Sequence, residues 1–194
     1  LALYGGRVVS FQYAGLSAGK ITRGLRLAEP GQTNLSSIPD YFQYLDTQGI
    51  IIDKESRREV IRQQVVRLAE EVGGTIPDDP ALLAEVTNLV EAPVALRGSF
   101  DPSHLSLPRE VLISVMKKHQ RYFPVMKNGK LMARFIAVRN GDDQHLDLVR
   151  EGNEHVIRAR FADANYFVRE DVKQPLEAYR VKLCRICEIE KRLH

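Results

Sequence analysis

The segment from Leu107 to Val138, LPREVLISVMKKHQRYFPVMKNGKLMARFIAV, contains clear signals for both a helix and a hairpin. Its first half repeats apolar residues at the spacing of one helix face, which predicts an amphipathic helix. The apolar positions with this spacing are Val111, Leu112, Val115 and Met116. The second half surrounds Asn128-Gly129, a dipeptide typical of two-residue hairpin turns. The segment therefore predicts a helix followed by a β-hairpin.

The same segment has an unusual distribution of charge. Between Val111 and Gly141 the chain carries seven Lys or Arg and no Asp or Glu. The predicted hairpin register places Lys127 opposite Lys130 and Phe123 opposite Arg134, and two facing lysines repel unless water solvates them or an anion bridges them. Two interpretations stay open: a solvated face, or a surface that contacts RNA phosphates. The cations expected to contact RNA are Lys117, Lys118, Arg121, Lys127 and Lys130.

The bulk composition is ordinary for a globular protein. The chain has 194 residues, 44% of them hydrophobic and 27% charged, which is enough for one large domain or two small ones. The net charge of +3 is too small to indicate a nucleic-acid partner by itself. No apolar run reaches the roughly 18 residues of a membrane span, so no membrane partner is expected. The start, LALYGGRVVSF, lacks a Met and a basic segment, so we expect an internal part of a longer protein.

Cysteine usage predicts no metal site. Cys184 and Cys187 form a single Cys-x-x-Cys motif with only His194 nearby, whereas structural zinc needs four ligands. We expect two free thiols on a helix. Two cysteines in a chain of this length favour a reducing compartment, and the predicted location is the cytoplasm.

Catalytic and nucleotide-binding motifs are also missing from the sequence. There is no G-x-x-x-x-G-K-[ST] loop, because AGKIT lacks the earlier glycine at the required spacing. His119 continues the apolar stripe of the predicted helix, which favours a core histidine over a catalytic one. Tyr122 could stack on a base, but a core position is favoured. The sequence therefore predicts no catalytic residue and no cofactor in this chain.

Capping signals mark the other helices. Asp53 and Gly73 bound one predicted helix, Asp79 caps the next, and Gly49 closes a short one before them. A strand is predicted at VALRGSF, residues 94–100.

A long helix is predicted from residue 149 onward. We expect Asn153 to cap this helix and Glu154 to pair with Arg158. Arg160 falls within the apolar stripe and is expected to need a buried or interfacial acid, for which Asp163 is the local candidate. A charged connector helix is expected after Pro175.

Several blocks together carry a resemblance to a known family. LPREVLISVMKKHQRYFPV and EGNEHVIRARFADANYF resemble consecutive blocks of the β subunit of heterotetrameric (α2β2) bacterial glycyl-tRNA synthetase. AGKITRGLR, LLAEVTNLVEAP and GSFDPSHLSLP fall in the family's order. Two positions depart from its usual pattern: Leu25 replaces a His and Ala92 replaces a Trp.

The resemblance implies a fold. It implies an α+β (mixed α/β) fold, similar to the B3/B4 module of phenylalanyl-tRNA synthetase, with helices packed on a mixed sheet. This domain is expected over residues 1–168. A helical connector is expected over residues 169–194, leading towards an HD-like domain.

The resemblance also implies a function. The expected role is a non-catalytic part of glycine–tRNA ligase that binds tRNA(Gly), the α subunit and the remaining β-subunit domains, while ATP and Mg bind at the α subunit. Two alternatives stay open, a hydrolytic editing domain and a purely structural spacer. Glycine has no smaller competitor that could enter its site, which disfavours editing.

Overall fold

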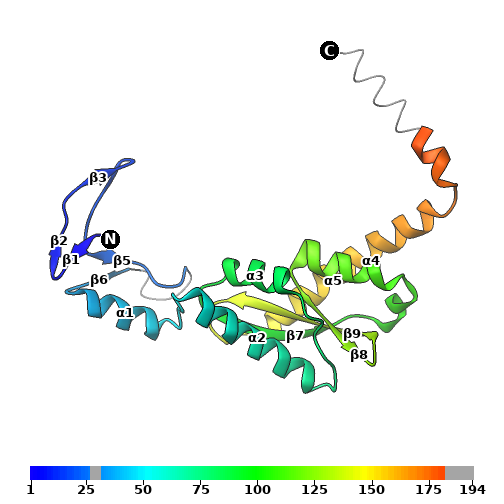
Figure 1. Cartoon of the computed structure of the whole chain (residues 1–194), viewed down its shortest axis with the longest axis horizontal. Coiled ribbons are helices and arrows are strands. Elements are labelled where there is room, and N and C mark those ends of the chain that lie inside the picture. Colours follow the sequence, from blue (N-terminus) through cyan, green and yellow to red (C-terminus); the bar gives the residue numbers. More distant parts are fainter. Residues whose placement is uncertain (27–31, 182–194) are drawn as a thin grey trace, which may run out of the picture.

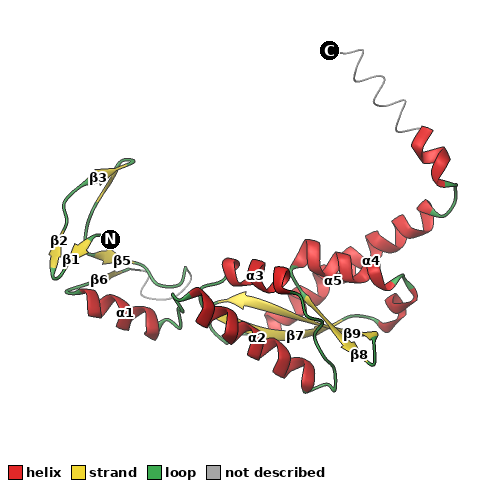
Figure 2. Ribbon diagram, viewed as in Figure 1, coloured by secondary structure: helices red, strands yellow, loops and turns green. Residues whose placement is uncertain are grey.

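The computed structural model of the chain describes residues 1–26 and 32–181. An N-terminal part of short paired strands and one helix precedes a larger part in which helices cover a sheet (Figures 1 and 2). The predicted α+β class is confirmed. The similarity to the B3/B4 module stays a prediction.

The N-terminal part is built from three two-stranded antiparallel ribbons and a helix. The ribbons are β1 (Leu3–Tyr4) with β2 (Arg7–Val8), β3 (Gln12–Tyr13) with β4 (Leu16–Ser17), and β5 (Ile21–Thr22) with β6 (Thr33–Asn34). Helix α1 (Ile38–Thr47) follows. The β3–β4 ribbon stands away from the rest of the molecule in Figure 1.

The larger part is a three-stranded sheet with helices on both faces. Its elements are α2 (Lys54–Glu70), α3 (Pro80–Leu89), β7 (Pro93–Ser99), the 3-10 helix η1 (Pro102–Ser106), α4 (Arg109–Ser114), the π-helix η2 (Val115–His119), β8 (Phe123–Lys127), β9 (Lys130–Asn140) and α5 (Leu146–Asp171). The strand order is β7-β9-β8, and both pairings are antiparallel. The predicted mixed sheet is therefore wrong. A two-residue turn joins β8 to β9, and such a turn can connect only antiparallel strands.

Alternation along β9 supplies both faces of the sheet with core residues. Phe135 and Ala137 pack on the side of α4 and α5, and Ile136 between them packs on the side of α2 and α3. Successive strand residues point to opposite faces, so a strand covered on both sides is continuously apolar. The run FIAV, residues 135–138, therefore contributes to the hydrophobic core on both faces of the sheet.

The hairpin register differs from the prediction in one respect. Lys127 pairs with Lys130 as expected, but Phe123 pairs with Ile136 and not with Arg134. The register shifts between Pro124 and Met126, because β9 contains extra residues there. Arg134 instead pairs with Ser99 of β7.

The predicted end of α1, both predicted ends of α2 and the predicted start of α3 are confirmed. Asp53 caps α2, accepting from the Ser56 N–H at 2.7 Å, and Asp79 caps α3, accepting from the Leu82 N–H at 3.0 Å. Gly49 and Gly73 have φ of +67° and +66° just beyond α1 and α2. That left-handed conformation is the usual helix terminator and favours glycine.

Helix α5 corrects three expectations. Asn153 lies inside the helix and does not cap it, because α5 begins at Leu146. Arg160 is exposed and needs no buried acid. Glu154 is predicted to pair with Arg158, but it accepts hydrogen bonds from the Ser99 N–H at 2.7 Å and the Ser99 hydroxyl at 2.8 Å. These bonds join α5 to the end of β7.

The proposed division at residue 168 falls inside α5, which continues to Asp171. Residues 182–194, which are half of the expected connector and include Cys184, Cys187 and His194, lie outside the described residues. The two-domain division therefore stays a prediction.

Candidate nucleic-acid interface

The five predicted RNA-contacting cations do not form one group. Lys117, Lys118 and Arg121 lie before β8, at the end of the π-helix, and Lys127 and Lys130 flank the turn after it. Strand β8 has five residues, so the two groups are separated by roughly 13 Å along the strand. Each group has its own electrostatic surroundings.

Acids of α3 compensate two cations of the first group. Lys117 forms an ion pair with Asp79, and Arg121 Nε donates to Glu85 Oε1 at 2.8 Å. Partial burial raises the pKa of Asp79, but hydrogen bonds from Lys117 and the Leu82 N–H outweigh it, so this pKa lies below its ordinary value. Part of the positive charge of the basic segment is thus neutralised by acids that lie about 36–38 positions earlier in the chain.

The π-helix sets the direction of the residues that follow Met116. A π turn holds more residues than an α turn, so later side chains rotate off the apolar stripe. His119 is therefore exposed, and its predicted core position is wrong. Arg121 then adopts φ +55°, which is uncommon for a residue with a side chain. Its guanidinium donates to the Lys118 carbonyl at 2.9 Å and so satisfies the helix end.

The hairpin turn exposes its cations to solvent. Asn128 and Gly129 have φ of +51° and +74°, as a tight primed turn requires. Lys127 and Lys130 face each other across it and are both exposed. Within residues 1–26 and 32–181, no carboxylate lies within ion-pair distance of Lys118, Lys127 or Lys130.

Tyr122 belongs to the core. Its ring stacks on Phe135 with centroids 4.5 Å apart and planes 12° apart, and its hydroxyl donates to Asn153 Oδ1 at 2.7 Å. Asn153 in turn donates to the Val149 carbonyl at 2.9 Å. Burial raises the pKa of Tyr122 to about 12. The ring is therefore held inside the protein and is not available to stack on a base.

Sequence reasoning missed two cavities near the far end of β9. The larger, of about 690 Å³, is lined by Arg23, Arg26 and Asn140 among others. The smaller, of about 290 Å³, is lined by Arg121 and Arg139 among others. The lining residues come from segments far apart in the sequence, so no local pattern predicts the cavities.

The His, Cys, Asp and Glu side chains of the described part of the chain form no cluster of three or more that could hold a metal ion. None of its helices is both long enough and apolar enough to span a bilayer.

Comparisons with known proteins identify similar chains. The sequence model of the family described as "Glycyl-tRNA synthetase beta subunit" matches residues 1–191. The glycine–tRNA ligase beta subunit of Clostridioides difficile (strain 630) is 46% identical over 183 residues, which cover 94% of this chain and 27% of that protein. The glycine–tRNA ligase beta subunit of Moorella thermoacetica is 46% identical over 184 residues, which cover 94% of this chain and 26% of that protein. That of Desulfitobacterium hafniense (strain Y51) is 43% identical over 192 residues, which cover 98% of this chain and 28% of that protein. The chain thus spans about a quarter of the length of these relatives.

Proposed function

Because the chain belongs to the glycyl-tRNA synthetase beta subunit family, we propose that it is a tRNA-contacting and assembly part of a glycine–tRNA ligase. In this proposal the ligation of glycine to tRNA(Gly), with its ATP and Mg, takes place on the α subunit in the cytoplasm. The described residues supply no nucleotide loop or metal cluster for that chemistry. The chain's own partners are tRNA, the α subunit and the remaining domains of the β subunit.

One observation carries the tRNA contact: three lysines lack an acid partner in the described structure. Lys127 and Lys130 face each other at an exposed turn, and Lys118 is exposed at the end of the π-helix. Two facing lysines repel unless something negative lies between or beside them. An RNA phosphate removes that repulsion and releases a counterion at each lysine, so binding becomes favourable and dependent on salt.

The other two predicted cations support this surface less directly. Lys117 and Arg121 already neutralise Asp79 and Glu85. An RNA phosphate would have to compete with these carboxylates, so we assign Lys117 and Arg121 mainly to holding the π-helix against α3.

A salt titration of tRNA affinity tests the proposal. The assembled enzyme is compared with a triple variant, Lys118→Ala, Lys127→Ala and Lys130→Ala. Removing one lysine that binds a phosphate should lower the slope of log K against log salt by roughly 0.9, so the triple variant should lower it by roughly 2.7. Glycine activation without tRNA should stay unchanged, since that chemistry is assigned to the α subunit.

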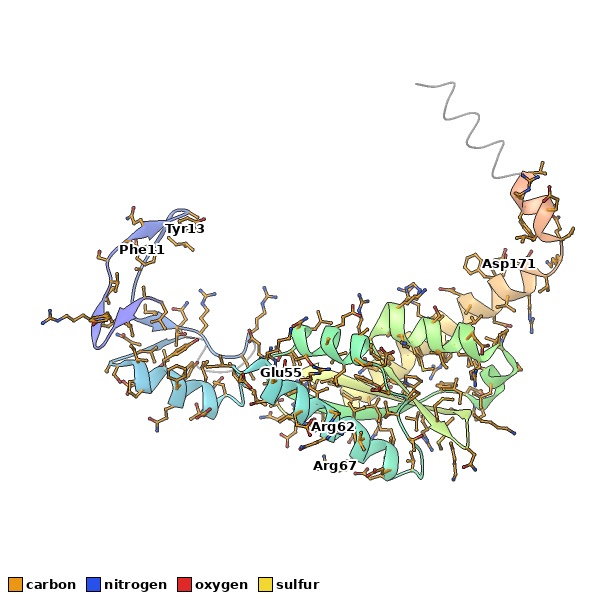
Figure 3. All side chains as sticks on the ribbon, viewed as in Figure 1. Phe11, Tyr13, Glu55, Arg62, Arg67 and Asp171 are labelled. Carbon is orange, nitrogen blue, oxygen red and sulfur yellow. The ribbon has the colours of Figure 1, made fainter. Side chains whose placement is uncertain are left out.

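A matched control removes the same charge elsewhere. Arg67→Ala, Arg158→Ala and Arg160→Ala change three exposed cations on α2 and α5, and Figure 3 shows Arg67 on α2. This control should keep the wild-type slope. If the lysine variant binds tRNA with the same affinity and slope as the control, the lysines are only solvated and the proposed contact is wrong.

A further inference from the structure

The two cavities meet at one exposed apolar residue. Leu89, at the C-terminal end of α3, lines both the cavity of about 690 Å³ and the cavity of about 290 Å³. Its side chain is 61% exposed, although the rest of this helix face is packed on the sheet. We call the combined hollow the Leu89 cleft. Its two volumes lie near or within the range of roughly 300–1,000 Å³ found for ligand sites.

The described lining of the larger cavity has an excess of positive charge. Arg23 and Arg26 both line it, and among the described residues neither has a carboxylate within ion-pair distance. With its amide reoriented, Gln32 accepts from Arg23 Nη2 at 2.8 Å, and this neutral partner leaves the charge of Arg23 in place. Glu91 is the acid in the lining, so two cations face one anion. Asn88 and Asn140 add polar groups to the wall.

Apolar side chains and a strained backbone shape the smaller cavity. The apolar lining residues are Val86, Leu89, Val90, Ala137, Val138 and Val149. The other lining residues are Gln120, Arg121, Tyr122, Arg139 and Asn153. Gln120 and Arg121 come directly after the π-helix, and Arg121 has φ +55°. π turns and left-handed non-glycine residues are costly and often mark functional sites. Here they place Gln120 and Arg121 in the lining of a largely apolar hollow.

We propose that the Leu89 cleft binds an unpaired stretch of RNA, with phosphates against Arg23 and Arg26 and a base in the smaller cavity. An unpaired base can turn out of its stack into a hollow, whereas a base of a duplex must first lose its pairing and stacking at a cost of about a few kcal/mol. In a single strand each phosphate is followed by a base, so cations can bind the phosphates while the neighbouring apolar pocket holds a base. This inference rests on the proposed function and adds a second RNA-binding region to it.

The position of the cleft permits one RNA to reach both regions. Asn140 ends β9 at the cleft and Lys130 begins the same strand at the hairpin. Eleven residues of strand place the two ends roughly 33 Å apart. A folded RNA can span this distance while only its unpaired part enters the cleft.

The test uses the assembled enzyme and a fluorescein-labelled RNA hexanucleotide, with a blunt RNA duplex and polyglutamate as competitors. Arg23→Ala/Arg26→Ala should lower the salt slope of hexanucleotide binding by roughly 1.4, since each neutralised phosphate of a single strand contributes roughly 0.7. Leu89→Asp places a carboxylate in the middle of the cleft and should weaken binding by roughly fivefold or more. Because Leu89 is exposed, this variant should fold normally.

Arg67→Ala/Arg158→Ala, which removes the same charge outside the cleft, should bind the hexanucleotide like the wild type. Wild-type affinity in both cleft variants would overturn the proposal, and so would equal competition by the duplex or by polyglutamate. The triple lysine variant separates the two claims. It should lose tRNA affinity and keep hexanucleotide affinity, and an equal loss of both would overturn the cleft as a separate site.

Discussion

Replacing Gly98 by alanine should destabilise the sheet domain, because a methyl group at this position collides with a buried ring. Gly98 on β7 pairs with Phe135 on β9. An added Cβ would lie 2.3 Å from Phe135 Cζ and 2.8 Å from both Cε atoms. The ring must recede by about 1 Å to reach an ordinary contact of 3.4 Å.

The surroundings of the ring resist that movement. Phe135 is fully buried and stacks on Tyr122, whose hydroxyl is bound to Asn153 on α5. Overpacking of such a site costs about 1–3 kcal/mol of unfolding free energy. A loss of about 2 kcal/mol should lower Tm by about 4–8 °C in a chain of this size.

Urea unfolding followed by circular dichroism measures the effect, and Gly152→Ala is the control. Gly152 lies inside α5 with no neighbouring atom within 4 Å of an added Cβ. Alanine there should stabilise the helix by about 0.5–1 kcal/mol, since it loses less backbone entropy than glycine. The same chemical change is thus expected to have opposite signs at the two positions. A Gly98→Ala variant as stable as the wild type would refute the close packing of Phe135 on β7.

Two predictions concern pH. Because burial raises the pKa of Tyr122 to about 12, its contribution to the free energy of unfolding should be fully present below pH 10 and fall between about pH 10 and 12. Urea unfolding at a series of pH values measures this loss, and Tyr122→Phe should not show the part that comes from the hydroxyl. Because the pKa of Asp79 is lowered from 3.8, its contribution is present above pH 3.8 and is lost as the pH falls through the lower folded value. Asp79→Asn, which can still cap α3, should flatten the acid side of the same profile, and an unchanged profile would show that the ion pair with Lys117 contributes no stability.

Local signals in the sequence predicted the elements of the fold well. Asp53 and Asp79 begin their helices and Gly73 ends one where the capping rules place them, and Asn128-Gly129 forms the predicted turn. These features depend on residues within a few positions of one another. The register shift in the hairpin depends on a distant residue, because Arg134 pairs with Ser99, which lies 35 positions earlier on β7. The sequence pattern also contains no signal for the π turn that exposes His119.

The candidate site was harder to predict, for the same physical reason. Arg121 and its partner Glu85 are 36 positions apart, so a scan of the basic segment counts the cation and not its acid. Arg23 and Asn140 are further apart still, yet they line one cavity. Tertiary packing around α3 brings these groups together, since Glu85 lies on α3 and its last residues, Asn88 and Leu89, line the cavity with Arg23 and Asn140.

That packing limits how much of the basic segment can act on an RNA. Of its seven cations, Lys117, Arg121 and Arg139 have a carboxylate within ion-pair distance. The four others are Lys118, Lys127, Lys130 and Arg134. Even if all four bind phosphates, they account for a salt slope of roughly 3.6. A steeper slope in the assembled enzyme would therefore require further cations, either in the Leu89 cleft or on other domains.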